Sequence, residues 1–170
     1  MKKIAALTAI LMLFLVYLPS CIKKSDPLSY ENGKINAEIV ISMNGTRLRA
    51  KMELMPLEEG KKRDASLVFL SPEGMAGLSV VRKDGKTQTT LGEFKLTELD
   101  GDALLSATEL FSTYGSVASA ETEELDGECV TRLSVINGSE TYTVWLTRVG
   151  LPRRIACKDM TVDVIWIESE

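Results

Sequence analysis

Residues 35–54, INAEIVISMNGTRLRAKMEL, decide the fold of this chain. Asn44-Gly45, at their centre, is the dipeptide most typical of a two-residue β-hairpin turn. With these residues at the central turn positions, Ile41 pairs with Leu48, and the apolar residues of both strands share one face while charged residues share the other. A slip of one residue would exchange the two faces. The segment therefore predicts antiparallel sheet with one apolar face.

A second turn signal extends the sheet. Asp84-Gly85 predicts a hairpin of residues 78–83 with residues 86–91, in which Val80 pairs with Thr89. This hairpin carries fewer apolar residues than the first.

The C-terminal third predicts a meander of four strands. Asn137-Gly138 gives a third hairpin, in which Leu133 pairs with Tyr142, and two further turns bring Ile155 beside Leu146. The apolar residues predicted to share one face are Leu133, Val135, Tyr142, Val144, Leu146, Ile155, Val162, Val164 and Trp166.

One convincing helix lies in the middle of the chain, over residues 102–115. Asp102 is its expected N-cap and Gly115 its C-terminal stop. The side expected to face the sheet carries Leu104, Ala107, Phe111 and Tyr114. Residues 116–128, which are rich in glutamate, predict a solvated loop.

These elements leave apolar surface uncovered. About eight strands make a sheet of roughly 750 Å² per face, and a helix of this length covers about 200 Å² of it. Such a face is not left open to water without a reason. We therefore predict a mainly β fold, a strongly curved antiparallel sheet or half-open β-barrel of about eight strands with the helix as plug or lid.

The N-terminus has the parts of an export signal. Lys2-Lys3 precede an apolar run that is short for a membrane-spanning helix and ends in Leu18-Pro19-Ser20-Cys21. This end resembles the lipobox of bacterial lipoproteins, in which the cysteine is acylated and becomes the first residue. The expected organisation is a signal peptide at 1–20, a lipidated flexible tether at 21–34 and a single β domain at 35–170. The resemblance implies a location in the bacterial cell envelope, anchored to a membrane on its extracytoplasmic side through Cys21.

The domain itself resembles the LolA and LolB type of bacterial lipoprotein carrier and receptor proteins. The resemblance rests on turns and spacing in four segments: Phe69-Leu70-Ser71-Pro72, Asp84-Gly85-Lys86, Leu104-Leu105, and Gly150-Leu151-Pro152-Arg153-Arg154-Ile155. In that family a half-open barrel lidded by helices holds acyl chains in an apolar cavity. The chain departs from the family by offering one lid helix and no amphipathic helix before the first strand.

Composition excludes several classes of function. The chain has no histidine, which removes the usual general base and the commonest metal ligand. Its net charge of −4 argues against a nucleic-acid partner. No catalytic motif, metal site or cofactor motif is present, so we expect a protein that is not an enzyme. For Cys129 and Cys157 the predicted strands place the Cα atoms about 11 Å apart, too far for a disulfide, although another register would allow one.

Two classes of function remain open. In the first, the protein binds an acyl chain or a lipoprotein in the cavity of the half-barrel, which is lined by Ile39, Ile41, Met52, Val80, Leu133, Val144 and Val164 and closed by the lid residues Leu104 and Phe111. In the second, the interior is fully packed and the protein is a non-enzymatic envelope lipoprotein that supports a protein partner.

Overall fold

The computed structural model describes residues 26–58 and 61–169, so the predicted signal peptide and Cys21 lie outside the described residues. Within them, no helix is long and apolar enough to cross a membrane. The elements are η1 (Ser29–Asn32), β1 (Ile35–Met43), β2 (Thr46–Leu54), β3 (Ala65–Ser71), η2 (Glu73–Met75), β4 (Leu78–Lys83), β5 (Lys86–Leu91), β6 (Phe94–Leu96), α2 (Gly101–Glu109), β7 (Ser116–Leu125), β8 (Glu128–Asn137), β9 (Glu140–Leu146), β10 (Pro152–Cys157) and β11 (Met160–Ser169).

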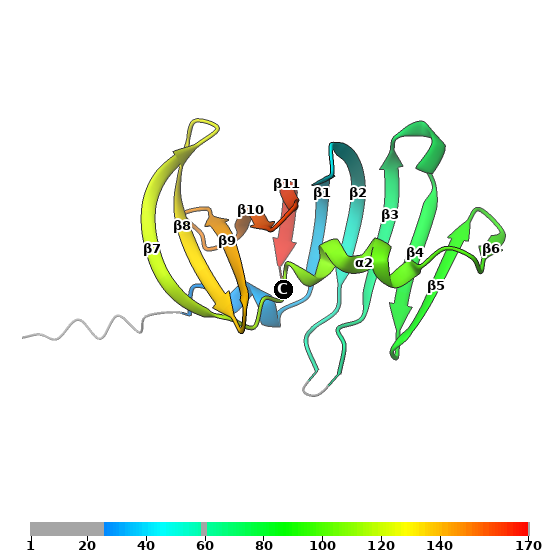
Figure 1. Ribbon diagram of the computed structural model, residues 1–170, viewed down its shortest axis with the longest axis horizontal. Helices are drawn as coiled ribbons and strands as arrows, with labels where there is room; N and C mark the ends of the chain where they lie inside the picture. Colours follow the sequence, from blue (N-terminus) through cyan, green and yellow to red (C-terminus); the bar gives the residue numbers. More distant parts are fainter. Residues whose placement is uncertain (1–25, 59–60, 170) are drawn as a thin grey trace, which may run out of the picture.

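All eleven strands of the described residues form one antiparallel sheet, in the order β6-β5-β4-β3-β2-β1-β11-β10-β9-β8-β7. The sheet does not close, because β6 and β7 are edge strands. Figure 1 shows how it curves, with α2 crossing one face. The curved antiparallel sheet with one helix is confirmed. The strand count exceeds the predicted eight because β3, β6 and β7 were not predicted as strands.

The first two hairpins have the predicted registers. Ile41 pairs with Leu48 across β1 and β2, and Val80 pairs with Thr89 across β4 and β5. Asn44 and its glycine neighbour both have positive φ, 50° and 77°, as a type I′ turn requires. Turn chemistry and the alternation of apolar residues agree here, and together they fix the register.

The predicted register of the third hairpin is wrong by two residues. Strand β8 runs on to Asn137, which pairs with Glu140, so Leu133 pairs with Val144 instead of Tyr142. Ile155 likewise pairs with Val144 instead of Leu146. The turn therefore begins one residue later than the Asn-Gly signal suggested. Because the shift is even, each side chain keeps its face.

Two segments of the sheet contradict the sequence prediction. Residues 116–128 are not a loop, since Ser116–Leu125 form β7, Asp126-Gly127 form a tight turn and Glu128 begins β8. As an edge strand, β7 has one neighbour and stays largely exposed, so it carries no apolar signal. Trp166 is 53% exposed and pairs with the outward-facing Glu38, because a bulge between Glu38 and Ile39 moves it off the apolar face.

The helix begins and ends earlier than predicted. Its N-cap is Asp100, whose Oδ1 accepts from the backbone N–H groups of Asp102 (3.1 Å) and Ala103 (3.2 Å). The helix ends at Glu109, and residues 110–115 continue without helical structure to β7. Tyr114 is exposed and therefore does not belong to the buried side.

Part of the predicted tether packs against the sheet. Leu28 and Tyr30, the latter in η1, are buried and belong to the hydrophobic core. Residues 28–32 of the predicted 21–34 tether are therefore part of the folded domain.

Candidate functional site

The predicted cavity residues all lie on the buried face of the sheet. Ile39, Ile41, Met52, Val80, Leu133, Val144 and Val164 are each at most 3% exposed and belong to one hydrophobic cluster. The face that they form is apolar and continuous from β4 to β8. Whether it binds a ligand stays a prediction.

Helix α2 and residues 110–114 cover this face, and we call them together the lid. Leu105 and Phe111 are fully buried against the sheet, whereas Leu104 is partly buried at the side of the cluster. At the start of the lid, a Cβ on Gly101 would lie 2.5 Å from Cγ2 of Thr87. Only glycine lets the helix approach β5 so closely.

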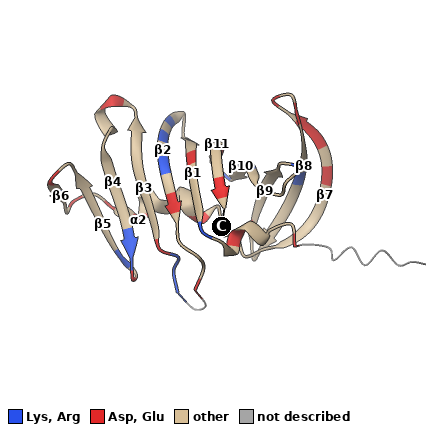
Figure 2. Ribbon diagram, turned by 180° about the vertical axis from the view of Figure 1, so that it is seen from behind, with Lys and Arg blue, Asp and Glu red and all other residues tan. Residues whose placement is uncertain are grey.

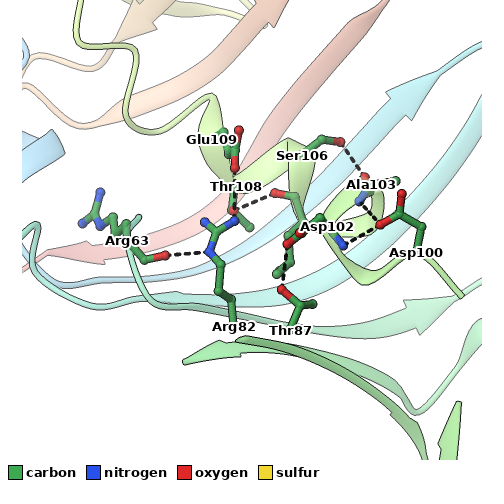
Figure 3. A network of polar contacts seen from close by, with 10 residues as sticks. Arg63, Arg82, Thr87, Asp100, Asp102, Ala103, Ser106, Thr108 and Glu109 are labelled. Atoms are coloured by element: carbon green, nitrogen blue, oxygen red, sulfur yellow. Dashed lines mark hydrogen bonds and ion pairs between the residues drawn. The ribbon is translucent and has the colours of Figure 1, made fainter. Parts of the chain in front are cut away.

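Polar contacts attach α2 to strands β4 and β5 (Figure 3). Thr87 donates to Asp102 over 2.7 Å, and the guanidinium of Arg82 donates to Glu109 over 3.1 Å. Nε of Arg82 also donates to the backbone carbonyl of Arg63 over 2.9 Å. Arg82 is 3% exposed and so links the lid, β4 and the β2–β3 loop from a buried position.

Arg63 connects the lid to two other segments. It is 5% exposed and donates to the carbonyl oxygens of Gly33 and Met55 and to Oγ of Ser112. These acceptors are uncharged, so the buried guanidinium has hydrogen bonds but no directly bonded carboxylate among the described residues. Burial lowers the pKa of Arg63, and the neighbouring Tyr114 and Glu31 oppose that effect.

Glu31, in η1, holds the end of the lid. Its carboxylate accepts from the backbone N–H of Thr113 (3.0 Å), the hydroxyl of Thr113 (2.7 Å) and the backbone N–H of Tyr114 (3.3 Å). Glu31 is 6% exposed. Burial raises the pKa of its carboxyl, and the hydrogen bonds from Thr113 only partly offset the effect.

This raised pKa gives a testable pH dependence. A carboxyl whose pKa is higher in the folded state favours folding when protonated, and that contribution is lost as pH rises through the folded pKa. Relative to Glu31→Gln, whose amide stays neutral, the wild type should therefore lose stability between mildly acidic and neutral pH. Urea titrations of both proteins across this range measure the difference. A difference that stays constant, or that favours the wild type as pH rises, would contradict the assignment.

A pocket of about 670 Å³ opens beside the lid. Residues of the β2–β3 loop form one wall and residues 108–114 of the lid another, with Asn137 and Tyr142 of the β8–β9 hairpin completing it. The buried Leu54 lies in its wall and also belongs to the hydrophobic cluster. The pocket therefore reaches the edge of the apolar face.

The sequence analysis did not identify the polar residues of this region. For Arg82 the sequence does contain a usable pattern. Leu78 and Val80 alternate along β4, and Arg82 is the next residue in this alternation, so it lies on the same inward face of the strand. Arg63 lies in a loop and Glu31 in the predicted tether. Neither segment has a regular spacing of apolar residues from which the burial of a side chain could be predicted.

The cysteines and the acidic side chains of the described residues offer no further site for chemistry. Cys129 and Cys157 are free. Among residues 26–58 and 61–169, no group of three or more histidine, cysteine, aspartate or glutamate side chains is arranged to hold a metal ion.

Comparisons with known proteins show similarity of fold. No protein-family model matches the chain, and no curated protein is similar to it in sequence. A chain in the complex structure of Pseudomonas aeruginosa MucA/MucB is 18% identical, with a TM-score of 0.50 over 84% of this chain and 54% of that chain. A structure of MucB is 17% identical, with a TM-score of 0.55 over 88% of this chain and 60% of that chain. An uncharacterized conserved protein from Thermus thermophilus is 13% identical, with a TM-score of 0.51 over 85% of this chain and 84% of that chain.

The chain spans little more than half the length of the MucB chains that it matches. At such low identity the similarity shows the fold alone. That fold is LolA-like, as the resemblance in the sequence implied.

Proposed function

We propose that this protein is an extracytoplasmic lipoprotein, anchored to a membrane through acylated Cys21, that binds the acyl chain of an apolar or amphiphilic ligand under the lid without catalysing a reaction. The observation that carries the proposal is the continuous apolar face of the sheet, covered by a nine-residue helix and the short segment after it. The LolA-like fold supports the same function.

The way in which the lid is attached supports a cover that can be displaced. Two polar contacts, Thr87 with Asp102 and Arg82 with Glu109, join the helix to β5 and β4, and the carboxylates on the helix side of both contacts are exposed. Leu104 is only partly buried, and the pocket of about 670 Å³ lies directly beside the lid. A chain that enters there reaches Leu54 and, behind it, the apolar cluster.

Photoaffinity labelling tests the proposal on the full chain. Membranes from bacteria that produce it are incubated with a fatty acid carrying a diazirine and an alkyne, irradiated, and analysed for labelled peptides. We expect saturable labelling of α2 and of the strands beneath it, reduced by unlabelled fatty acid. Leu104→Ala should speed ligand exchange because it removes a contact of the lid, whereas Leu99→Ala, at an exposed position before the helix, should not. Labelling that does not saturate would contradict the proposal.

A second candidate function is the binding of a protein partner in the envelope. One of the structures with a similar fold is a complex of MucA with MucB, and β7 of this chain offers an exposed edge of ten residues. An extended segment of a partner could add to such an edge as a further strand. Saturable labelling by the fatty acid would favour the first candidate.

A further inference from the structure

The pocket beside the lid has a charge opposite to that of the chain. Four cationic and two anionic side chains line the pocket. The cations are Lys61, Lys62, Arg63 and Arg82, and the anions are Glu58 and Glu109. The chain as a whole carries a net charge of −4. Figure 2 shows basic residues in the β2–β3 loop and at the end of β4, along the lower edge of the sheet.

The two carboxylates neutralise only part of this charge. Glu58 pairs with Lys61 over 2.6 Å and Glu109 with Arg82 over 3.1 Å. Lys62 forms no ion pair within the described ranges, so its ammonium group is available to an additional anion. Arg63 donates to uncharged oxygens and interacts electrostatically with Glu31, so it adds positive charge to the wall of the pocket without a directly bonded carboxylate.

Burial makes the arginines more effective. Arg63 and Arg82 are at most 5% exposed, and their hydrogen bonds fix them in place. A charge in a less polarisable environment attracts an anion more strongly than the same charge in water does. The exposed Lys61 and Lys62 lie at the rim, where an entering anion meets them first.

The pocket is also partly apolar. Leu54 is 1% exposed and Tyr142 is 9% exposed, and both line the pocket and belong to the hydrophobic cluster. A free inorganic anion would make no use of these surfaces. An amphiphile would use both, with its charge among the basic side chains and its chain along the apolar wall.

We propose that this pocket binds the anionic head group, a carboxylate or a phosphate, of an amphiphile whose acyl chain lies under the lid. The assignment rests on the function proposed above and adds the chemistry of the head group. Lys61 and Lys62 attract the head group at the rim, and Arg63 and Arg82 contribute the fixed positive charge of the wall.

The test compares three photoactivatable probes of equal chain length on the full chain in membranes: an alkyl phosphate, a fatty acid and the corresponding alcohol. We expect the wild type to bind both anionic probes at least about tenfold more tightly than the alcohol, the factor typical of one hydrogen bond to a charged group. The double variant Lys61→Gln/Lys62→Gln should lose most of this preference while labelling by the alcohol stays unchanged. Both lysines are exposed, so the substitution leaves the buried core intact.

The matched control is Lys86→Gln/Lys95→Gln, which removes the same charge from exposed positions on β5 and β6. It should keep the preference for the anionic probes. Saturable labelling by the alcohol without a preference for anions, or a preference that survives in Lys61→Gln/Lys62→Gln, would overturn the head-group assignment and leave acyl-chain binding standing. Inorganic phosphate that displaces the anionic probes as well as unlabelled alkyl phosphate does would show a site for free anions and would also overturn it. Absence of saturable labelling by all three probes would remove the proposed function itself.

Discussion

Replacing Phe111 by alanine should lower the free energy of unfolding by about 3 to 5 kcal/mol, as the truncation of a buried phenylalanine does. Phe111 is fully buried and is the largest side chain by which the lid contacts the sheet. The lid contains the only α-helix within the described residues, so little can move in to fill the space. Urea titration followed by the fluorescence of Trp145 and Trp166 measures the loss.

Phe94→Ala is the matched control. Phe94 lies in the edge strand β6 and is 76% exposed, so the same substitution there should change stability by less than about 0.5 kcal/mol. If Phe111→Ala cost no more than Phe94→Ala, the lid would not be packed against the sheet as described.

Replacing Arg63 by alanine should destabilise the fold by about 3 kcal/mol or more, because each buried acceptor left without its donor costs about 1 to 3 kcal/mol. The substitution leaves the carbonyls of Gly33 and Met55 and the hydroxyl of Ser112 without their donor. It also removes a cation that interacts with the buried Glu31. The η1 segment, the β2–β3 loop and the lid would lose their common contact.

Arg63→Lys separates charge from geometry. An ammonium group keeps the charge but cannot reach three acceptors as a planar guanidinium does, so this variant should fall between the wild type and Arg63→Ala. Arg49→Ala serves as the control for the loss of an arginine, because Arg49 is half exposed and pairs with Glu38 on the outer face. Such a surface pair contributes at most about 1 kcal/mol. Equal losses for Arg63→Ala and Arg49→Ala would contradict the network.

Residues at tight turns allowed much of the fold to be predicted. Asn44-Gly45 and Asp84-Gly85 readily adopt the positive φ that a two-residue hairpin turn requires. In the register that each turn sets, the apolar residues of the two flanking strands lie on the same face. Where those two signals agree, the register is right. At Asn137 the dipeptide signal was present, but β8 extends through the asparagine and the turn begins at Gly138. Local turn preference does not distinguish two registers that differ by an even number and bury the same face.

The features that the sequence did not predict, strand β7 and the buried charged residues at the lid, depend on the position of these residues in the folded sheet and on contacts between distant segments. Strand β7 is polar because its outer edge faces solvent. A polar segment lacks the alternation of apolar and polar residues that would distinguish a strand from a loop. Glu31 and Arg63 are buried through hydrogen bonds to lid residues that lie 82 and 49 positions away from them in the sequence, respectively. Burial of a charged residue by partners so far away leaves no local pattern.

The placement of β1 beside β11 has a consequence for how the chain reaches its native state. Every other strand pair joins neighbours in the sequence, so each half of the sheet assembles from hairpins with short loops. The pair of β1 and β11 instead brings Ile35 opposite Ser169. The loop of chain that this pairing closes contains nearly the entire domain, so its entropic cost is the largest in the sheet. This pairing needs both ends of the domain at once, so it cannot form before β11 is available to β1. We expect the joining of the two halves to be the slow step of folding.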